Sequence, residues 1–246
     1  MKIAAICCTY KRPKILAEAI NCFTKQEYPE HLREMIILDD AGQYDRRAMD
    51  GIPGVRLVVS DHRFRTLGEK RNASAALASP DVDAYCVWDD DDIYLPWHMS
   101  AAAMSLANAD YAIPTILYID KVGRLEIKKN SGLFHGSWSF TRKAFDDAGG
   151  YPFIQSGQDQ GILVRFKSRG LRRSDPLEHF PPSYVYRWYT AHDLHISAMG
   201  RNGYERLSKT PFDAVSDLPS APERDWLRLH SMAWAEHCNS RSKVAQ

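Results

Sequence analysis

The sequence has no long apolar run, and this absence argues against a membrane-spanning protein. None of its apolar stretches approaches the roughly 18 residues that a transmembrane helix needs. The opening segment, MKIAAICCTYKR, has too short an apolar core for a signal peptide and continues into basic residues without a small-residue cleavage site. Internal repeats and low-complexity segments are also absent. We therefore expect a globular protein in the cytoplasm.

The sequence has few cysteines and almost no net charge. The five cysteines are odd in number and lack the spacing of a metal site, so we expect free thiols in a reducing setting. The formal net charge is only +1, which favours neither a nucleic acid nor a membrane surface as a partner. The basic run 169–173 (RGLRR) is expected to be a solvated surface, unless it gathers into a local patch.

The first part of the chain alternates strand patterns with helical patterns. Continuous apolar runs of four to six residues are typical of strands buried on both faces. Their alternation with helices predicts a parallel sheet in an α/β fold. The predicted strands are 3–8, 35–38, 55–59 and 85–88, and the predicted helices are 13–26 and 67–77.

The pattern changes after Trp97, where we expect a mixed region. The predicted strands are 111–118, 125–128 and 184–188, and the predicted helices are 101–107, 143–148 and 160–168. A linker-like stretch from Lys209 leads to a helix at 223–237 with an apolar stripe. We expect this stripe to pack against the body, with a dimer or membrane-surface contact as the alternative.

Polar clusters follow three of the predicted strands, at 9–12, 39–40 and 89–92. Ligands bind at the carboxyl ends of the strands in an open α/β sheet, so these clusters predict a site there. Four consecutive aspartates at 89–92 repel one another, and a divalent cation such as Mg²⁺ or Mn²⁺ would offset that repulsion. The alternative is a solvated acidic loop or an aspartate-rich helix N-terminus.

These segments resemble, in order, those of GT-A glycosyltransferases, specifically inverting members of glycosyltransferase family 2. VWDDDDIYLPWHM resembles the Asp-x-Asp region, IAAICCTYKRP the first strand and its turn, MIILDDAG the second strand, and GEKRNASAALAS the helix with a phosphate-facing arginine. HGSWSFTRKAFDDAGGYP, GQDQGILVRFKSRG and YRWYTAHDLHIS are similar to the acceptor half and to a late segment with a metal-binding histidine. The resemblance covers roughly residues 1–200.

The resemblance implies a fold and a division of the chain. The fold is α/β of the GT-A type, a Rossmann-like nucleotide-binding half with a central mixed sheet joined to an acceptor-binding half. We expect the nucleotide-sugar-binding half at 1–97, the acceptor-binding and catalytic half at 98–205, and a C-terminal extension with a helix at 206–246.

The resemblance also assigns donor residues. Thr9 and Tyr10 match the turn that holds the nucleotide base, with Tyr10 stacking on uracil, and Arg12 is assigned to the same donor site. Asp40 matches the acid that accepts from the uracil N3–H, so UDP-sugars are the first choice of donor. The remaining donor residues are Arg71, matched to a base- or phosphate-contacting arginine, and Asp89 or Asp90, near the ribose. The alternatives are purely structural roles, namely core packing for Tyr10 and pairing with Asp39 or Glu69 for Arg71.

Metal, acceptor and catalytic residues come from the same resemblance. Asp91 and His195 are assigned to the Mn²⁺ or Mg²⁺ ion, with His192 as a rival to His195, and Asp159 is assigned as the catalytic base. Gly136, Ser137, Trp138 and Gln158 are assigned to the sugar or acceptor. The alternatives are a dipole-stabilised helix acid for Asp159, a core histidine for His195 and burial for Trp138.

Two departures from the family pattern narrow the expectation. The usual Glu-Asp pair at the base is Gln158-Asp159 here, which leaves one carboxylate. The Gln-x-x-Arg-Trp segment of polymer synthases is missing, so a processive membrane synthase is not expected. The expected function is inverting transfer from a UDP-sugar to a hydroxyl acceptor, with a saccharide or another small molecule as the expected acceptor.

Two alternative functions, and a third that the sequence favours less, remain open. One is glycosylation of hydroxymethylated pyrimidines in phage DNA, for which the basic run 167–173 would meet phosphates. The other is a non-catalytic nucleotide- or cation-binding module. A nucleotidyltransferase is less favoured, because its Gly-rich phosphate loop is missing near residues 9–13. The sequence does not define an oligomeric state.

Overall fold

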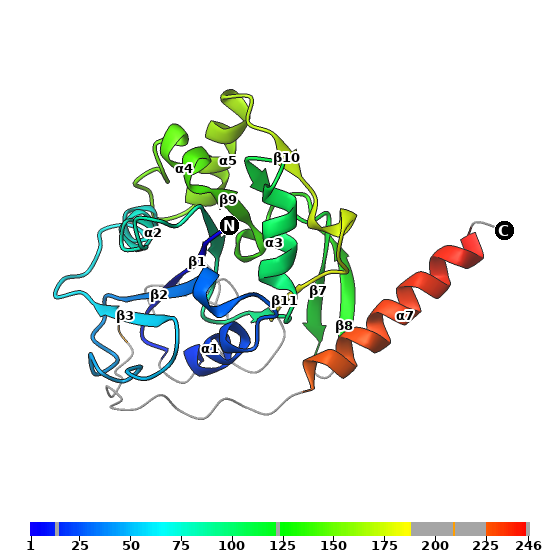
Figure 1. Cartoon of the computed structure of the whole chain (residues 1–246), viewed down its shortest axis with the longest axis horizontal. Helices are drawn as coiled ribbons and strands as arrows, with labels where there is room; N and C mark the ends of the chain where they lie inside the picture. Colours follow the sequence, from blue (N-terminus) through cyan, green and yellow to red (C-terminus); the bar gives the residue numbers. More distant parts are fainter. Residues whose placement is uncertain (13–14, 122–123, 188–208, 210–224, 245–246) are drawn as a thin grey trace.

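The computed structural model describes residues 1–12, 15–121, 124–187, 209 and 225–244. Its centre is a mixed sheet of seven strands in the order β3-β2-β1-β4-β9-β6-β10 (Figure 1). The first four are parallel to one another, whereas β9 runs antiparallel to both β4 and β6. The strands are β1 Ile3–Thr9, β2 Arg33–Asp39, β3 Val55–Val59, β4 Ala84–Val87, β6 Tyr111–Ala112, β9 Ser139–Thr141 and β10 Arg173–Ser174.

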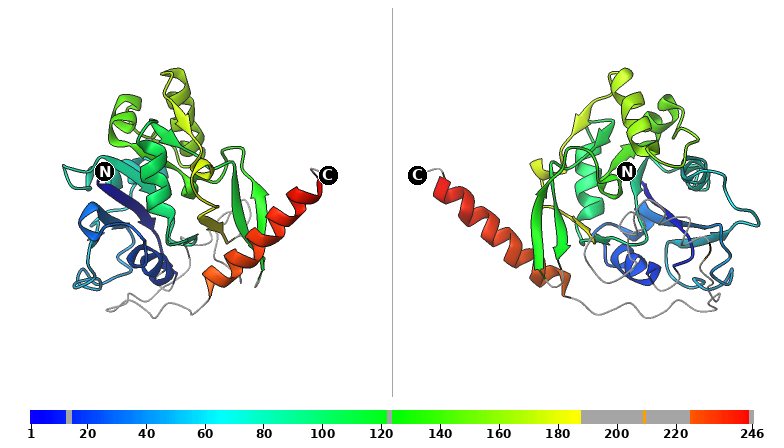
Figure 2. Two further views of the ribbon diagram at one scale, coloured as in Figure 1. Left: turned by 45° about the vertical axis from the view of Figure 1, so that its right-hand side comes forward. Right: turned by 180° about the vertical axis from the view of Figure 1, so that it is seen from behind.

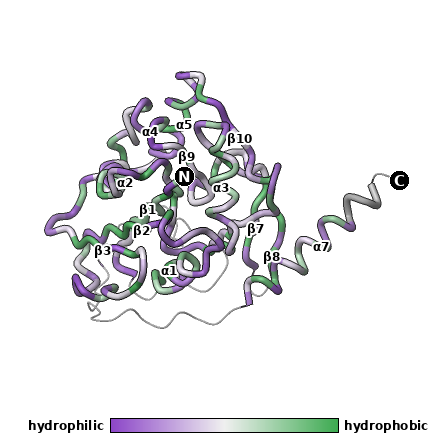
Figure 3. Tube along the Cα trace, viewed as in Figure 1, coloured by the Kyte–Doolittle hydropathy of each residue, from purple (hydrophilic) through white to green (hydrophobic). Residues whose placement is uncertain are grey.

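Strand β1 is buried on both faces, which explains its continuous apolar run. Ile3, Ala5 and Cys7 belong to one hydrophobic cluster, whereas Ala4 and Ile6 belong to a second one on the opposite face. Figure 3 shows these central strands as apolar stretches within a more mixed chain. The sheet therefore separates two cores, as the doubly covered parallel arrangement predicted.

Helices cover both faces of this sheet. The α1 and α3 helices contribute to the cluster around Ile3, and α2, α4 and α5 pack with the cluster around Ile6 or cover that face. Figure 1 shows α1 and α2 on opposite sides of the parallel strands. The helices are α1 Leu16–Thr24, α2 Leu67–Ala76, α3 His98–Leu106, α4 Arg142–Ala148 and α5 Gln158–Ser168.

A second sheet of four strands lies beside the first, in the order β5-β11-β7-β8. Its strands are β5 Ile93–Tyr94, β7 Ile116–Lys121, β8 Arg124–Lys129 and β11 Tyr184–Tyr186, and helix α7 Trp226–Val244 packs against it. The Tyr118 hydroxyl lies 2.8 Å from His230 Nδ1 of α7, and Ala233 is buried. The C-terminal part of α7 extends away from the body (Figure 2). Among the described residues, no helix is long and apolar enough to cross a membrane.

The structure corrects one predicted element and adds others. The predicted strand 111–118 is interrupted around Pro114, so its two ends form β6 and β7 in different sheets. Strand β9, which joins β4 to β6, was not predicted, nor were β5 and β10. The last predicted strand, 184–188, ends at Tyr186 in the structure, and its final residue lies outside the described ranges.

Candidate active site

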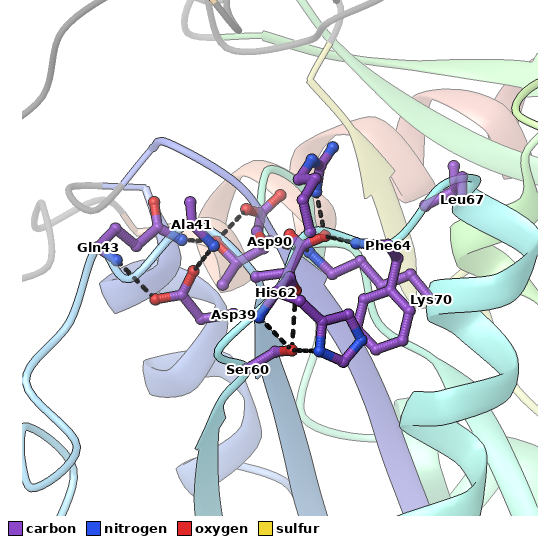
Figure 4. Close-up of polar contacts among 12 residues, drawn as sticks. Asp39, Ala41, Gln43, Ser60, His62, Phe64, Leu67, Lys70 and Asp90 are labelled. Atoms are coloured by element: carbon purple, nitrogen blue, oxygen red, sulfur yellow. Dashed lines mark hydrogen bonds and ion pairs between the residues drawn. The ribbon is translucent and has the colours of Figure 1, made fainter.

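Polar segments from three neighbouring strands meet at one edge of the large sheet. β2, β1 and β4 are adjacent and parallel, so the residues that follow them emerge on the same side. Thr9 Oγ1 donates a 2.7 Å hydrogen bond to Asp90 Oδ2, and Gln43 Nε2 donates to Thr9 Oγ1 at 2.8 Å. The three clusters predicted from the sequence are therefore connected by hydrogen bonds, and Figure 4 shows several of their side chains together.

The two aspartates at the end of β2 have different partners. Asp39 accepts hydrogen bonds from the backbone N–H groups of Ala41 at 2.9 Å, Gln43 at 2.7 Å and Tyr44 at 3.3 Å. Burial raises the pKa of Asp39, while these N–H groups lower it. Asp39 therefore shapes the turn, whereas its neighbour Asp40 contacts Lys70 of α2.

Both carboxylate oxygens of Asp40 accept hydrogen bonds from basic side chains. Its Oδ1 accepts from Lys70 Nζ at 2.5 Å, and its Oδ2 accepts from Arg63 and from the Phe64 N–H at 3.2 Å. The guanidinium carbon of Arg63 lies 3.6 Å from the centre of the Tyr10 ring. Arg63 thus makes the two contacts expected of uracil, stacking on Tyr10 and donating to Asp40. Sequence reasoning identified neither Arg63 nor Lys70.

The acidic run pairs with an arginine from the turn after β1. Lys11 has a left-handed backbone with a φ of 53°, and the next residue, Arg12, lies against the acidic run. Its guanidinium contacts Asp90 Oδ1 at 2.5 Å and Asp91 Oδ2 at 2.7 Å, and both carboxylates are buried. Burial raises the pKa of Asp90 to about 6, against the opposing effect of Arg12. Burial alone lowers the pKa of Arg12, but the charges of Asp90 and Asp91 outweigh it and raise that pKa.

The flanking aspartates of the run have their own partners. Asp89 pairs with Arg71 at 3.0 Å, so Arg71 does not make the alternative pairs with Asp39 or Glu69. Burial alone lowers the pKa of Arg71, whereas the charge of Asp89 raises it, and the net shift is upward. Asp92 accepts from the Tyr184 hydroxyl and, at 3.1 Å, from the Arg187 N–H. Asp92 is thereby held within the protein, away from the open edge.

The carboxylates of Asp90 and Asp91 fit a divalent cation. They already share one positive group, the Arg12 guanidinium, so both face a common position. Mg²⁺ is usually held by one or two carboxylates together with phosphate oxygens and water. The described ranges contain no group of three or more histidine, cysteine, aspartate or glutamate side chains suited to a metal. The predicted ligand His195 and its rival His192 lie outside those ranges.

The predicted base lies on a segment anchored to the donor side. Asn72 of α2 pairs with the Tyr151 backbone at 2.8 and 2.9 Å, and the Gly68 N–H donates to the Ile154 carbonyl at 3.1 Å. These bonds fix the loop before α5 against the helix that carries Arg71. Asp159, the second residue of α5, is half-buried and accepts from Gln160 Nε2 at 3.3 Å.

The four residues assigned to sugar or acceptor are all buried. A Cβ on Gly136 would lie only 2.8 Å from Asp89 Oδ2, so the 3₁₀ turn His135–Ser137 touches the acidic run directly. Ser137 is buried and donates to the Phe134 carbonyl at 2.6 Å. Trp138 is 1% exposed, which favours the burial alternative, and Gln158 is 6% exposed. Of the four, Gly136 is the one at which an added Cβ would meet the acidic run.

Family comparison gives a match over most of the chain. The family model described as Glycosyl transferase family 2 matches residues 4–170. No curated protein matches the chain.

Solved structures share the fold at low sequence identity. S. aureus TarS 1-349 in complex with UDP-GlcNAc gives a TM-score of 0.63 at 16% identity, covering 79% of this chain and 60% of that one. TarS 1-349 in another crystal structure gives 0.61 at 17% identity, covering 76% of this chain and 61% of that one. The mannosyltransferase PcManGT from Pyrobaculum calidifontis, in complex with GDP-Man and Mn²⁺, gives 0.61 at 16% identity, covering 95% and 69%. The aligned region therefore spans about three fifths of the TarS fragments.

Proposed function

Because the chain belongs to glycosyl transferase family 2 and has the GT-A fold, we propose that this enzyme transfers a sugar from a UDP-sugar to a hydroxyl group with inversion. Family membership makes it a glycosyltransferase. The observation that carries the finer proposal is the meeting of Thr9, Asp40, Arg71 and the acidic run at one edge of the sheet. Tyr10 joins this group through Arg63, which contacts both its ring and Asp40.

The donor base is the first part of the proposal. Thr9, Tyr10 and Asp40 form a surface with an aromatic ring and a buried carboxylate, which suits a flat base carrying an N–H donor. TarS, a fold relative, has been solved with UDP-GlcNAc. PcManGT has been solved with GDP-Man, so a guanosine donor is the alternative outcome to test.

The cation is the second part of the proposal. Asp91, with Asp90 beside it, would hold Mn²⁺ or Mg²⁺, and His195 is proposed as a further ligand. PcManGT was solved with Mn²⁺. When bound, such an ion supplies positive charge to the departing diphosphate. Arg71 adds a guanidinium beside Asp89, suitable for a phosphate oxygen or for the ribose side of the donor.

Asp159 is proposed as the catalytic base. Its carboxylate takes the proton from the acceptor hydroxyl as that oxygen attacks the anomeric carbon and the bond to the diphosphate breaks. A single displacement inverts the anomeric configuration, so one carboxylate is enough and Gln158 needs no acidic function. The Gly157 backbone, with a φ of 78°, turns the chain into α5 immediately before these residues.

The acceptor is proposed to be a saccharide or another small hydroxyl compound. Residues 98–205 would bind it, opposite the donor-binding residues 1–97, with residues 206–246 as an appendage. DNA with hydroxymethylated pyrimidines is the second candidate, favoured by the exposed basic residues Lys167, Arg169 and Arg172 at and beyond the end of α5. Binding to DNA would weaken steeply with added salt, whereas binding to a neutral saccharide would not.

A donor panel tests the proposal. The protein is incubated with Mn²⁺ and with UDP-, GDP- and CMP-sugars, and slow donor hydrolysis and thermal stabilisation are measured. We expect both responses with UDP-sugars alone, and NMR of any product should show the anomeric configuration opposite to that of the donor. A response limited to GDP-sugars would contradict the base assignment. Thermal stabilisation of the protein by a nucleotide sugar, without hydrolysis or transfer, would favour the non-catalytic module. The absence of any response to the whole panel would contradict the proposal.

A further inference from the structure

A buried ion pair lies behind the acidic run and has no part in the proposed chemistry. Glu18 of α1 and Arg187, which follows β11, are each 5% exposed, and Arg187 Nη1 donates to Glu18 Oε2. Burying two charges costs several kcal/mol per ion before their attraction is counted, so a buried pair by itself is weak support for stability. Its other contacts suggest a different role.

Arg187 holds the backbone that carries the proposed cation ligand. Its Nε donates to the Asp91 carbonyl at 2.5 Å, and its own N–H donates to Asp92 Oδ1 at 3.1 Å. The Asp91 carboxylate meanwhile contacts Arg12. Asp91 is therefore held through its carbonyl by Arg187 and through its side chain by Arg12. A fixed carbonyl restricts rotation of this peptide and with it the direction of the carboxylate.

Glu18 connects this arrangement to the C-terminal helix. Its Oε1 accepts a 3.1 Å hydrogen bond from Trp226 Nε1, and Trp226 is the first residue of α7. The next turn of α7 brings His230 against the Trp97 ring, with 4.7 Å between ring centres. A continuous set of contacts thus runs from α7 through Glu18 and Arg187 to Asp91.

We propose that Arg187 is a positioning residue for Asp91, and that Trp226 and Glu18 couple the docking of α7 to the geometry of the cation site. The inference rests on the proposed function, because it assigns a metal-binding role to Asp91. It gives the C-terminal extension, which lies beyond the region of family resemblance, a role in shaping the cation site. Without α7 docked, Glu18 loses one of its two partners and Arg187 is less firmly held.

The test measures Mn²⁺ affinity in the presence of UDP, by the electron paramagnetic resonance signal of free Mn²⁺. Removing Arg187 alone would leave Glu18 buried without its counter-ion, and that variant can fail to fold. The double variant Glu18→Gln with Arg187→Met removes both charges together. We expect it to keep a thermal midpoint near that of the parent, to bind Mn²⁺ at least tenfold more weakly, and to bind UDP without metal as the parent does.

Single variants separate the two halves of the inference. Trp226→Phe removes the N–H that reaches Glu18 and keeps an aromatic ring at the start of α7, and we expect Mn²⁺ affinity to fall twofold to fourfold. Arg187→Lys retains a positive charge but loses the guanidinium geometry, so its Mn²⁺ affinity should lie between those of the parent and the double variant. The matched control is Glu236→Gln, which breaks the exposed Arg124–Glu236 pair between α7 and β8 and should leave Mn²⁺ affinity unchanged.

The outcomes are distinguishable. A parent protein that binds neither Mn²⁺ nor a nucleotide sugar overturns the proposed function and the inference together. A parent that binds both, with a folded double variant of unchanged Mn²⁺ affinity, overturns the inference alone. Equal losses in Trp226→Phe and Glu236→Gln would show that α7 acts only through general stability, which also overturns it. A double variant that fails to fold leaves Arg187→Lys as the deciding case, where parental Mn²⁺ affinity overturns the positioning role.

Discussion

The proposed donor side and the proposed acceptor side of the site are built differently. On the donor side, Asp40, Asp90 and Asp91 are at most 5% exposed and each contacts an arginine or lysine. On the acceptor side, Asp159 is half-buried, and the nearby loops expose Leu133 and Phe153 at 66% and 68%.

This difference suggests how the two substrates are recognised. Groups that act on developing charge are most effective when they are fixed before the reaction, and burial with ion pairing fixes the donor side. An open rim with exposed apolar residues leaves room for an acceptor that the fold does not define. We therefore propose that buried carboxylates recognise the donor once Arg12 and Arg63 have moved aside, and that acceptor selectivity depends on the loops around Asp159.

The largest expected effect comes from the acceptor side. Asp159→Asn removes the base but leaves the side chain's size, so transfer should fall on the order of 10³-fold, within the range for a general base. UDP affinity should stay at the parental value, because the donor groups are untouched. Initial transfer rates and calorimetric titration with UDP check the two halves. Loss of UDP binding in this variant would contradict the separation of the two sides.

The next largest effect is expected at the cation position. Asp91→Asn removes one carboxylate facing the shared position, and Mn²⁺ affinity measured with UDP should fall on the order of 10²-fold. Asp147→Asn on the exposed face of α4 makes the same charge change far from the run and serves as the control. Unchanged Mn²⁺ affinity in Asp91→Asn would remove Asp91 from the metal site.

A steric change sharpens the comparison where the two sides touch. In Gly136→Ala the new Cβ would lie 2.8 Å from Asp89 Oδ2, so Asp89 or the turn must shift. Overpacking of this kind costs about 1–3 kcal/mol, and the KM for the donor should rise roughly tenfold. Ser137→Ala in the same turn adds no atoms and should leave that KM nearly unchanged. Steady-state kinetics at varied donor concentration distinguish the two variants.

The smallest effect is an increase in affinity. Arg63 stacks on Tyr10 and pairs with Asp40, so a nucleotide base must displace it. An exposed or partly exposed pair contributes about 0.2–1 kcal/mol, so Arg63→Ala should bind UDP about twofold to fivefold more tightly. Arg65→Ala, two residues along the same loop and 87% exposed, controls for the lost charge. Weaker UDP binding in Arg63→Ala alone would instead make Arg63 a base contact.

Local patterns predicted much of the fold, and long-range packing accounts for what they missed. Strands β1, β2 and β4 were predicted because burial on both faces demands an apolar residue at nearly every position. Strand β3 lies at the edge of the sheet and is only partly buried, but its valines and leucine still indicated a strand. Strand β9 has three residues, too few to show any period, and it forms only by pairing with β4 and β6. The split at Pro114 was missed because both flanking segments have strand character.

The same limit applies to the site. The family motifs identified Asp40, Arg71 and the acidic run, and the structure brings these residues to one edge. Arg63 lies 23 positions from Asp40, in a segment without a motif. Arg187 belongs to the late segment YRWYTAHDLHIS, but its partner Glu18 lies 169 positions away, so the motif did not reveal the pair. A basic residue shortly after a predicted strand, near the predicted ligand edge, is a signal that could have pointed to Arg63. No local sequence feature indicates a role for Glu18, because the surrounding segment has the pattern of an ordinary helix.

The most direct test of the central claim is a crystal structure of the protein with UDP and Mn²⁺, with the ion located by its anomalous scattering. We predict the ion bound directly to the Asp91 carboxylate, with the Arg12 guanidinium displaced from it. The uracil ring should lie on Tyr10 with its N3–H toward Asp40, in the place of Arg63. An ion bound away from the acidic run, or a uracil ring elsewhere on the protein, would contradict the account.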